Sequence, residues 1–293
     1  MKLNSIFTLK QPLSHIGDSE SATVFLNTIK IVNADNKTED IFAYNGNALR
    51  GALRDCSARY LLKSLGVKVK KQMFNILFSG GNISGSLSND IEQATKYREL
   101  LPMISLFGAG VGNQILAGKI SQTFALPVCA ETRHIISDAE GINSELFAMS
   151  WRKMTGTVSF NRTDDLKNIN LNKYAQLDEN EEKDPQQMRY EVEYYAAGTQ
   201  LFHSMEIADA TEIEIGALIA ALYEFSENPV LGGMSSKGFG LCSVEMFSEN
   251  ERAVKIDDGI ELSHEMSAAL SKYNDFLADN KDEIIKFIGG APL

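Results

Sequence analysis

The order of strand-like and helix-like patterns constrains the fold of this 293-residue chain most strongly. Residues 3–9 and 22–32 alternate apolar and polar side chains near the period of two that half-buried strands show. Residues 48–65 repeat apolar side chains at helical spacing, with Asn47 as the predicted N-cap and Gly66 as the predicted stop. The rest of the chain predicts strands over 119–128, 155–162, 191–207 and 239–247, a helix from the capping box of Thr211 and Glu214 to Phe225, and a terminal helix over 262–277.

Strand, helix, strand, strand, helix, strand is the order of a ferredoxin-like fold, which RNA-recognition modules also use. We therefore predict an α+β chain whose single domain, residues 1–293, has a ferredoxin-like, RRM-type core. Residues 72–117 form a less regular insertion around a glycine and serine patch at 79–86, and residues 249–293 form a C-terminal helical extension. A second, polar insertion over 164–190 is either a loop or a protruding hairpin, and its composition favours the loop.

Composition limits the classes of function. No apolar run approaches the length of a membrane span, and the first residues lack the apolar stretch of a signal peptide, so we expect a cytoplasmic protein without a membrane partner. Cys56, Cys129 and Cys242 are odd in number, widely spaced and flanked by apolar residues, which is typical of reduced core thiols. The four histidines show no metal-ligand spacing, and we expect neither a metal nor another cofactor.

Charge is unevenly distributed along the chain. The net charge of −11 argues against a protein that coats nucleic acid without discrimination, because charge of this sign repels phosphate at long range. Residues 50–71 nevertheless contain seven basic residues and one acid, Asp55, whereas residues 178–184 form an acidic run. The basic stretch is compatible with a local groove for an anionic partner.

A glycine-rich loop lies between the predicted helix that ends near Phe225 and the strand over 239–247. Its residues 232–240 read Gly-Gly-Met-Ser-Ser-Lys-Gly-Phe-Gly. Four glycines permit a backbone that side chains would block, and such a loop can expose consecutive N–H groups. Together with Lys237 and the hydroxyls of Ser235 and Ser236, these N–H groups are suited to a phosphate or an RNA backbone. An ordinary tight turn is the alternative.

Six segments, in order, carry a resemblance to a known family. They are residues 13–17 (Leu-Ser-His-Ile-Gly), 44–54 (Tyr-Asn-Gly-Asn-Ala-Leu-Arg-Gly-Ala-Leu-Arg), 106–108 (Leu-Phe-Gly), 155–157 (Thr-Gly-Thr), 197–202 (Ala-Gly-Thr-Gln-Leu-Phe) and 232–240. In this order they resemble the motifs of RAMP-superfamily backbone subunits, which polymerise along guide RNA in class 1 CRISPR effector complexes of types III and IV. The resemblance implies binding of guide RNA (crRNA), base pairing to a target nucleic acid, and contacts with copies of itself and with other effector subunits.

The resemblance also implies which residues contact RNA. Arg50 and Arg54 lie about 40° apart on the predicted helix, so both can line one groove and bind phosphate oxygens. In the family, a hairpin called the thumb crosses the guide–target duplex, and the 164–190 insertion takes its place, with Met188 and Arg189 as stem or tip residues. The full set of expected RNA-binding residues is His15, Asn45, Asn47, Arg50, Arg54, Arg133, Arg162, Met188, Arg189, Ser235, Ser236, Lys237 and Phe239.

Asn27 bears on catalysis. Relatives that cut target RNA carry an aspartate in the segment after the first glycine turn, and Asn27 stands near that position here. An amide supplies no carboxylate for proton transfer or metal binding. We therefore expect a non-cleaving backbone subunit of type IV character and no catalytic residue. The alternatives are a target-cleaving or guide-processing endoribonuclease that uses Asp18, His15 or Lys237, and a small-molecule phosphate binder, which the missing G-x-x-x-x-G-K-[ST] motif disfavours.

Overall fold

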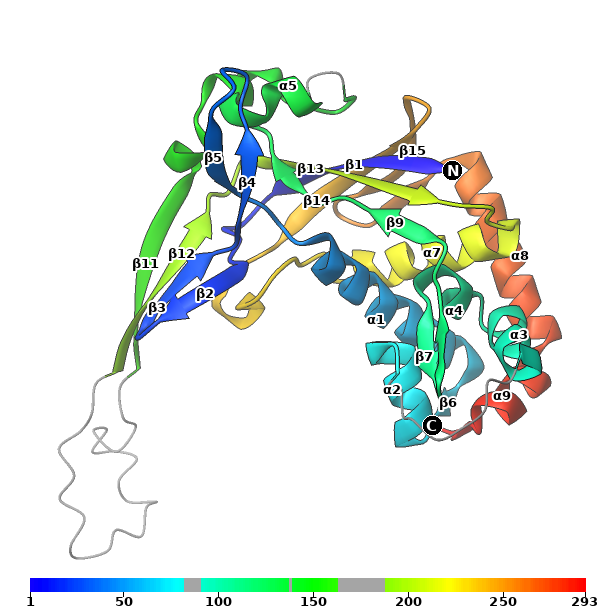
Figure 1. Cartoon of the computed structure of the whole chain (residues 1–293). Helices are drawn as coiled ribbons and strands as arrows, with labels where there is room; N and C mark the ends of the chain where they lie inside the picture. The colour runs from blue at the N-terminus through cyan, green and yellow to red at the C-terminus, as the bar shows by residue number, and fades with distance from the viewer. Residues whose placement is uncertain (82–90, 137–138, 163–187) are drawn as a thin grey trace, which may run out of the picture.

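The central element of the fold is an antiparallel sheet, seen in a computed structural model that describes residues 1–81, 91–136, 139–162 and 188–293. Its strands follow the order β10-β13-β1-β14-β15-β16, and β9 also pairs with β13 (Figure 1). Every pairing within this sheet is antiparallel. The strands are β1 (Lys2–Leu9), β9 (Ile120–Gln122), β10 (Leu126–Pro127), β13 (Gln200–Ile207), β14 (Cys242–Ser248), β15 (Glu251–Ile256) and β16 (Ile260–Leu262).

Two helices, α1 (Gly46–Leu65) and α7 (Glu212–Ser226), pack on each other beneath this sheet (Figure 1). The chain runs β1, α1, β9 with β10, β13, α7, β14, and the sheet order β10-β13-β1-β14 is that of a ferredoxin-like fold. The predicted α+β fold class is thus confirmed. Behind α7 lies α8 (His264–Asp279), which approaches so closely that a Cβ on Gly216 would stand 2.2 Å from the Ala269 carbonyl oxygen.

The capping interactions of both core helices follow from their sequences. α7 begins at the predicted capping box, in which Thr211 and Glu214 exchange side-chain and backbone hydrogen bonds. α1 ends, as predicted, at Gly66, whose φ of 70° is left-handed. Its N-cap, however, is Asn45 and not Asn47, because the Asn45 side chain accepts the N–H of Asn47 at 2.8 Å.

A second sheet, with the order β11-β12-β3-β2, lies to one side of the core (Figure 1). β11 and β12 form an antiparallel pair in register from Thr155↔Tyr195 to Arg162↔Met188, and β12 is parallel to β3. Residues 163–187, which contain most of the predicted thumb-like insertion, lie outside the described residues. The strands are β2 (Ile16–Glu20), β3 (Thr23–Leu26), β11 (Thr155–Arg162) and β12 (Met188–Tyr195).

Three strands that the sequence predicts as continuous are each divided in the structure. The stretch 191–207 turns at Gly198, where φ is 82°, so that β12 and β13 belong to different sheets. The stretch 22–32 is interrupted at Asn27, which separates β3 from β4 (Thr28–Val32), and among the described strands β4 pairs only with β5 (Thr38–Phe42). The stretch 119–128 gives β9 and β10. Both halves of each stretch retain strand-forming residues, so the stretches read as continuous, although the period of two in 22–32 slips between Leu26 and Ile29.

Residues 72–117 are more regular than predicted. They contribute helices that pack against α1 and α7, and the side chains of Leu101, Met103 and Ile104 are fully buried. The Gly-Ser patch lies largely in residues 82–90, outside the described part of the chain. The elements are α2 (Lys71–Ser79), α3 (Ile91–Leu100), α4 (Pro102–Phe107), β7 (Ala109–Val111) and β8 (Gln114–Leu116).

The remaining elements are short or close the C-terminal part. They are β6 (Val67–Lys68), η1 (Ala130–Thr132), α5 (Arg133–Ile136), η2 (Ser144–Ala148), η3 (Trp151–Met154), η5 (Ser235–Lys237), α9 (Lys281–Ile288) and β17 (Ala291–Pro292), which pairs with β6. Cys56, Cys129 and Cys242 are buried free thiols, as the sequence predicts. Among the described helices, none is long and apolar enough to cross a membrane.

Candidate nucleic-acid interface

The glycine loop over 232–240 is fixed against the segment that follows β1. Gly233 N–H donates to the Ser14 carbonyl at 3.1 Å, and Gly240 N–H donates to the Pro12 carbonyl at 2.8 Å. A Cβ on Gly232, whose φ is 72°, would stand 2.3 Å from Ser14 O. The predicted row of free N–H groups is therefore wrong in part, because several donate within the protein. The side chains of Ser235, Ser236 and Lys237 remain exposed.

His15 and Tyr44 join this loop to the start of α1. Nε2 of His15 accepts the N–H of Asn45 at 3.1 Å, and the His15 and Tyr44 rings lie 4.3 Å apart. The Tyr44 hydroxyl accepts the N–H of Gly232 at 3.1 Å. Burial lowers the pKa of His15, which favours the neutral ring that this acceptor role needs. Three of the motif segments, 13–17, 44–54 and 232–240, thus meet at one place.

Lys237 extends from the loop onto aromatic rings of the β11-β12 hairpin. Its ammonium group donates to the Tyr190 hydroxyl and lies 4.4 Å from the centroid of the Tyr190 ring and 5.0 Å from that of Phe160. The Phe160 and Tyr190 rings are stacked at 5.4 Å. Phe239 is buried beneath, 6.1 Å from Phe160, so it supports the cluster and offers little surface to a ligand. The sequence analysis missed Phe160, which lies in the predicted strand over 155–162, whereas Tyr190 falls at the end of the predicted insertion over 164–190.

The far end of the same hairpin carries three further predicted residues. Met188 is 62% exposed. The guanidinium of Arg189 forms an exposed ion pair with Glu191 at 3.2 Å and donates to Ser159 Oγ at 3.0 Å. Arg162 pairs with Met188 across the two strands. These residues therefore lie on the same pair of strands as the rings beneath Lys237, one or two residues farther along it.

Arg50 and Arg54 lie side by side as predicted, but they point to the end of α4. Arg54 is only 8% exposed, and its guanidinium donates to the carbonyls of Phe107 and, at 2.8 Å, Gly108. Arg50 also donates to Phe107 O. Burial, and next the charge of Arg50, lower the pKa of Arg54 to about 10, while Asp55 acts in the opposite direction. These arginines thus bind free carbonyls at a helix C-terminus, which cations favour.

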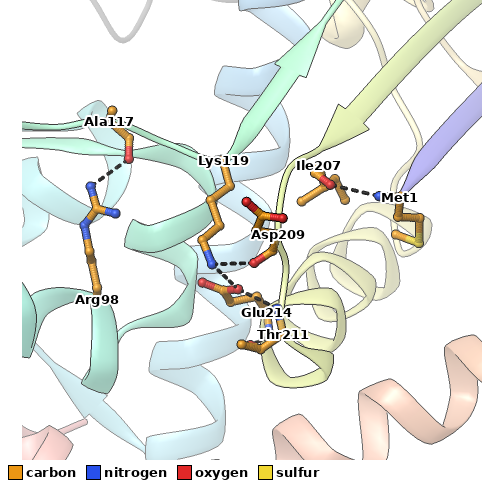
Figure 2. A network of polar contacts seen from close by, with 8 residues as sticks. All are labelled: Met1, Arg98, Ala117, Lys119, Ile207, Asp209, Thr211 and Glu214. Carbon is orange, nitrogen blue, oxygen red and sulfur yellow. Dashed lines mark hydrogen bonds and ion pairs between the residues drawn. The ribbon is translucent and has the colours of Figure 1, made fainter.

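Other basic residues of this stretch are also bound internally. Glu224 is 8% exposed and accepts hydrogen bonds from Arg59 at 3.1 Å and Lys63 at 2.6 Å. Figure 2 shows a comparable contact, in which Lys119 donates to Glu214 at 2.7 Å and to the Asp209 carbonyl at 2.9 Å. The basic stretch is therefore not one continuous groove.

Arg133 lies apart from the loop. It is exposed on α5, with its guanidinium 5.9 Å from the Phe147 ring. His134 on the same helix contacts the Val32 carbonyl at 3.0 Å, at the end of the β4-β5 hairpin. Figure 1 shows this corner well separated from the start of α1.

Asn27 links two parts of the fold. Its Nδ2 donates to the Ala43 carbonyl at 2.8 Å, and its N–H donates to the His15 carbonyl at 2.8 Å. A carboxylate has no N–H for Ala43 O, so the amide is the group that fits. Asp18 is exposed and accepts the N–H of Ser19 at 2.7 Å. Within the described residues, no group of three or more His, Cys, Asp or Glu is arranged to hold a metal ion.

Comparison with solved structures finds the same fold elsewhere. A chain of a structure titled "Type IV-B CRISPR Complex" superposes with a TM-score of 0.60 and 18% sequence identity, over 86% of this chain and 93% of that chain. No family model matches the sequence. No curated protein matches it either. At this identity the likeness establishes the fold, an α+β architecture with a ferredoxin-like core.

Proposed function

We propose that this chain is a guide-RNA-binding backbone subunit of a class 1 CRISPR effector complex of type IV character. The observation that carries the proposal is the meeting of three resemblance-bearing segments around His15, Tyr44 and Gly232, with exposed Lys237 beside them. The fold shared with a chain of a Type IV-B CRISPR complex supports it.

The proposed RNA path runs over the loop and along the hairpin. Lys237 and the hydroxyls of Ser235 and Ser236 are exposed donors for backbone phosphates, and Asn47 is exposed in the first turn of α1. Met188 and Arg189, with Arg162 across the strands, continue the path. Specificity for a target comes from base pairing by the guide.

Several predicted contacts take a different part in this proposal. His15, Asn45, Arg54 and Phe239 position the loop, α1 and the aromatic cluster, because their polar groups or rings are bound within the protein. Arg50 and Arg133 are secondary phosphate contacts at two separate places. The chain associates head to tail with its own copies, since an open filament needs a heterologous contact, and with other effector subunits.

We infer that the subunit does not cleave RNA. The Asn27 amide is engaged with Ala43 O, and Nε2 of His15 is engaged with Asn45 N–H. A ribonuclease needs a general base within reach of the 2′-hydroxyl and a second group for the leaving oxygen. Exposed Asp18 stands without such a partner among the described residues. These contacts disfavour the endoribonuclease alternative.

Co-expression with a guide RNA tests the proposal. We expect a large, ribonuclease-sensitive particle in light scattering, with a raised absorbance ratio and RNA of discrete length on extraction. The combined variant Ser235→Ala, Ser236→Ala, Lys237→Gln should yield protein with little RNA, whereas Lys37→Gln, which removes an exposed charge elsewhere, should assemble normally. An RNA-free monomer that ignores added guide would overturn the proposal. Discrete cleavage products from a target RNA with Mg²⁺ would overturn the non-cleaving part alone.

A further inference from the structure

An exposed aromatic pair lies on α2, at the other end of α1 from the glycine loop. Phe74 is 47% exposed and stacks on Phe78, with ring centroids 4.3 Å apart and planes at 21°. Phe78 also packs against the core. The Phe74 ring is thus held by Phe78 and remains exposed to solvent. An exposed ring fixed in this way is typical of a binding surface.

Three lysines precede this pair in the chain. Lys68, Lys70 and Lys71 are exposed, and no acid lies in the first turn of α2. Within the described residues, none of the three forms an ion pair. They differ in this from Arg59 and Lys63, which Glu224 neutralises. In a chain of net charge −11, they form a local unneutralised patch.

A cleft of about 620 Å³ adjoins the aromatic pair. Phe78 lines it together with Arg50, Arg54 and exposed Ile115, and none of the described residues that line it is acidic. Nε of Arg50 is buried there without a hydrogen-bond partner. The two guanidinium groups repel each other, the Asp55 carboxylate offsets this only in part, and an anion in the cleft relieves the repulsion. Because Phe78 belongs to both features, the cleft leads directly to the aromatic pair.

We propose that this ridge, defined as Lys68, Lys70, Lys71, Phe74 and Phe78, binds a single strand of nucleic acid, with a phosphate of the strand in the adjoining Arg50 cleft. A base stacks on the exposed Phe74 ring, and the lysines contact the neighbouring phosphates. A flat ring flanked by unpaired cations is the combination that single-strand-binding surfaces use. A protein partner would cover the ring but would need its own acids opposite each lysine.

The ridge lies apart from the glycine loop, although its adjoining cleft is lined by Asn47 and Arg50, which the proposed guide interface also uses. α1 has 20 residues and is therefore about 30 Å long. The glycine loop contacts its start, through His15 and Asn45, whereas the three lysines follow its end (Figure 1). The ridge thus binds a strand whether or not the loop holds a guide.

Fluorescence anisotropy with a labelled oligouridylate and a labelled oligothymidylate of about 12 nucleotides tests the proposal. The full chain is used in the Ser235→Ala, Ser236→Ala, Lys237→Gln background, which weakens the guide interface and leaves the ridge intact. Phe74→Ala should weaken binding about 5- to 100-fold, while Phe74→Trp retains it. The triple variant Lys68→Gln, Lys70→Gln, Lys71→Gln should reduce the salt-dependence slope by about 2.

The matched control removes three exposed lysines elsewhere, Lys2→Gln, Lys37→Gln and Lys281→Gln, and should leave the slope unchanged. Equal losses in the control and ridge variants would mean a general charge effect and would overturn the ridge. So would unchanged binding by Phe74→Ala, or no binding of either strand. The relative affinity of the two oligonucleotides identifies the strand as RNA or DNA. Failure of guide-dependent assembly would leave these outcomes unaffected, so the two proposals fail separately.

Discussion

Arg54 and Lys237 are both cations that the sequence analysis predicts to contact RNA, yet their surroundings in the fold are opposite. Arg54 is 8% exposed and donates to two carbonyls at the end of α4, while Lys237 lies in the open on the rings of Phe160 and Tyr190. A buried guanidinium with backbone partners is part of the folded structure, whereas an exposed ammonium on a ring can exchange that contact for a phosphate. A motif therefore indicates where a cation lies, and its partners indicate what it does.

The largest expected effect is on stability at Arg54. Arg54→Ala should lower the free energy of unfolding by about 3 kcal/mol or more, because two carbonyls lose hydrogen bonds to a charged group. Lys237→Ala should cost less than about 1 kcal/mol, the contribution of an exposed cation–π contact. Urea unfolding of both variants makes the measurement. Similar losses of unfolding free energy in the two variants would show that Arg54 and Lys237 do not differ in their contribution to the fold.

The second effect concerns an interior histidine. His203 is fully buried, neither ring nitrogen has a hydrogen-bond partner, and burial lowers its pKa to about 4. Below about pH 6.5 the imidazole of His203 takes up a proton in the unfolded chain but not yet in the folded one. The free energy of unfolding should therefore fall progressively as pH drops from about 6.5 to about 4. At roughly 1.4 kcal/mol per pKa unit, His203 accounts for about 3 kcal/mol of that loss.

Urea unfolding at a series of pH values measures this loss. His203→Leu should flatten the curve in that window, leaving a smaller slope of the same sign from His15, whose pKa burial also lowers. A His203→Leu curve parallel to that of the wild type would show that other groups cause the acid sensitivity.

The third effect sharpens the comparison within the glycine loop itself. Gly232→Ala should destabilise the protein by about 2–3 kcal/mol, because the residue has a φ of 72° and its Cβ would press on Ser14 O. Gly233→Ala, one residue along, meets nothing within 4 Å and should be nearly neutral. Comparison of these two variants by thermal unfolding isolates the cost of placing a Cβ at residue 232 against Ser14 O. A neutral Gly232→Ala would mean that the loop is not fixed to the 12–14 segment.

The sequence predicted the order of the core elements because amphipathic periods and caps are local. The stop at Gly66 and the capping box of Thr211 and Glu214 are encoded within a few residues, and both are confirmed. The division of 191–207 was not predictable in this way, since strand-forming residues continue on both sides of Gly198. Which sheet each half joins depends on partners far away in the chain.

The candidate site shows the same limit. The motifs located segments near Asn45 and Gly232 that meet in the fold, because glycine and capping patterns are visible locally. Burial of Arg54 required α4, which lies 53 residues along the chain, and the platform under Lys237 required Tyr190, 47 residues away. Long-range contacts of this kind decide whether a cation is bound internally or left free, and no local pattern reports them.

The smallest effect on stability is expected at Lys237. Substitution there tests RNA binding most directly. Lys237→Gln should leave the unfolding free energy within about 1 kcal/mol of wild type while reducing the salt slope of guide-RNA binding by about 0.7, the value of one phosphate contact with a single strand. Lys237→Arg should restore the slope, since a guanidinium keeps both the charge and the ring contact. Lys37→Gln, exposed and unpaired within the described residues, removes the same charge away from the loop and should keep the wild-type slope. If Lys237→Gln and Lys37→Gln lower the affinity for RNA equally, the effect comes from the net charge of the protein. Lys237 would then make no specific contact with RNA.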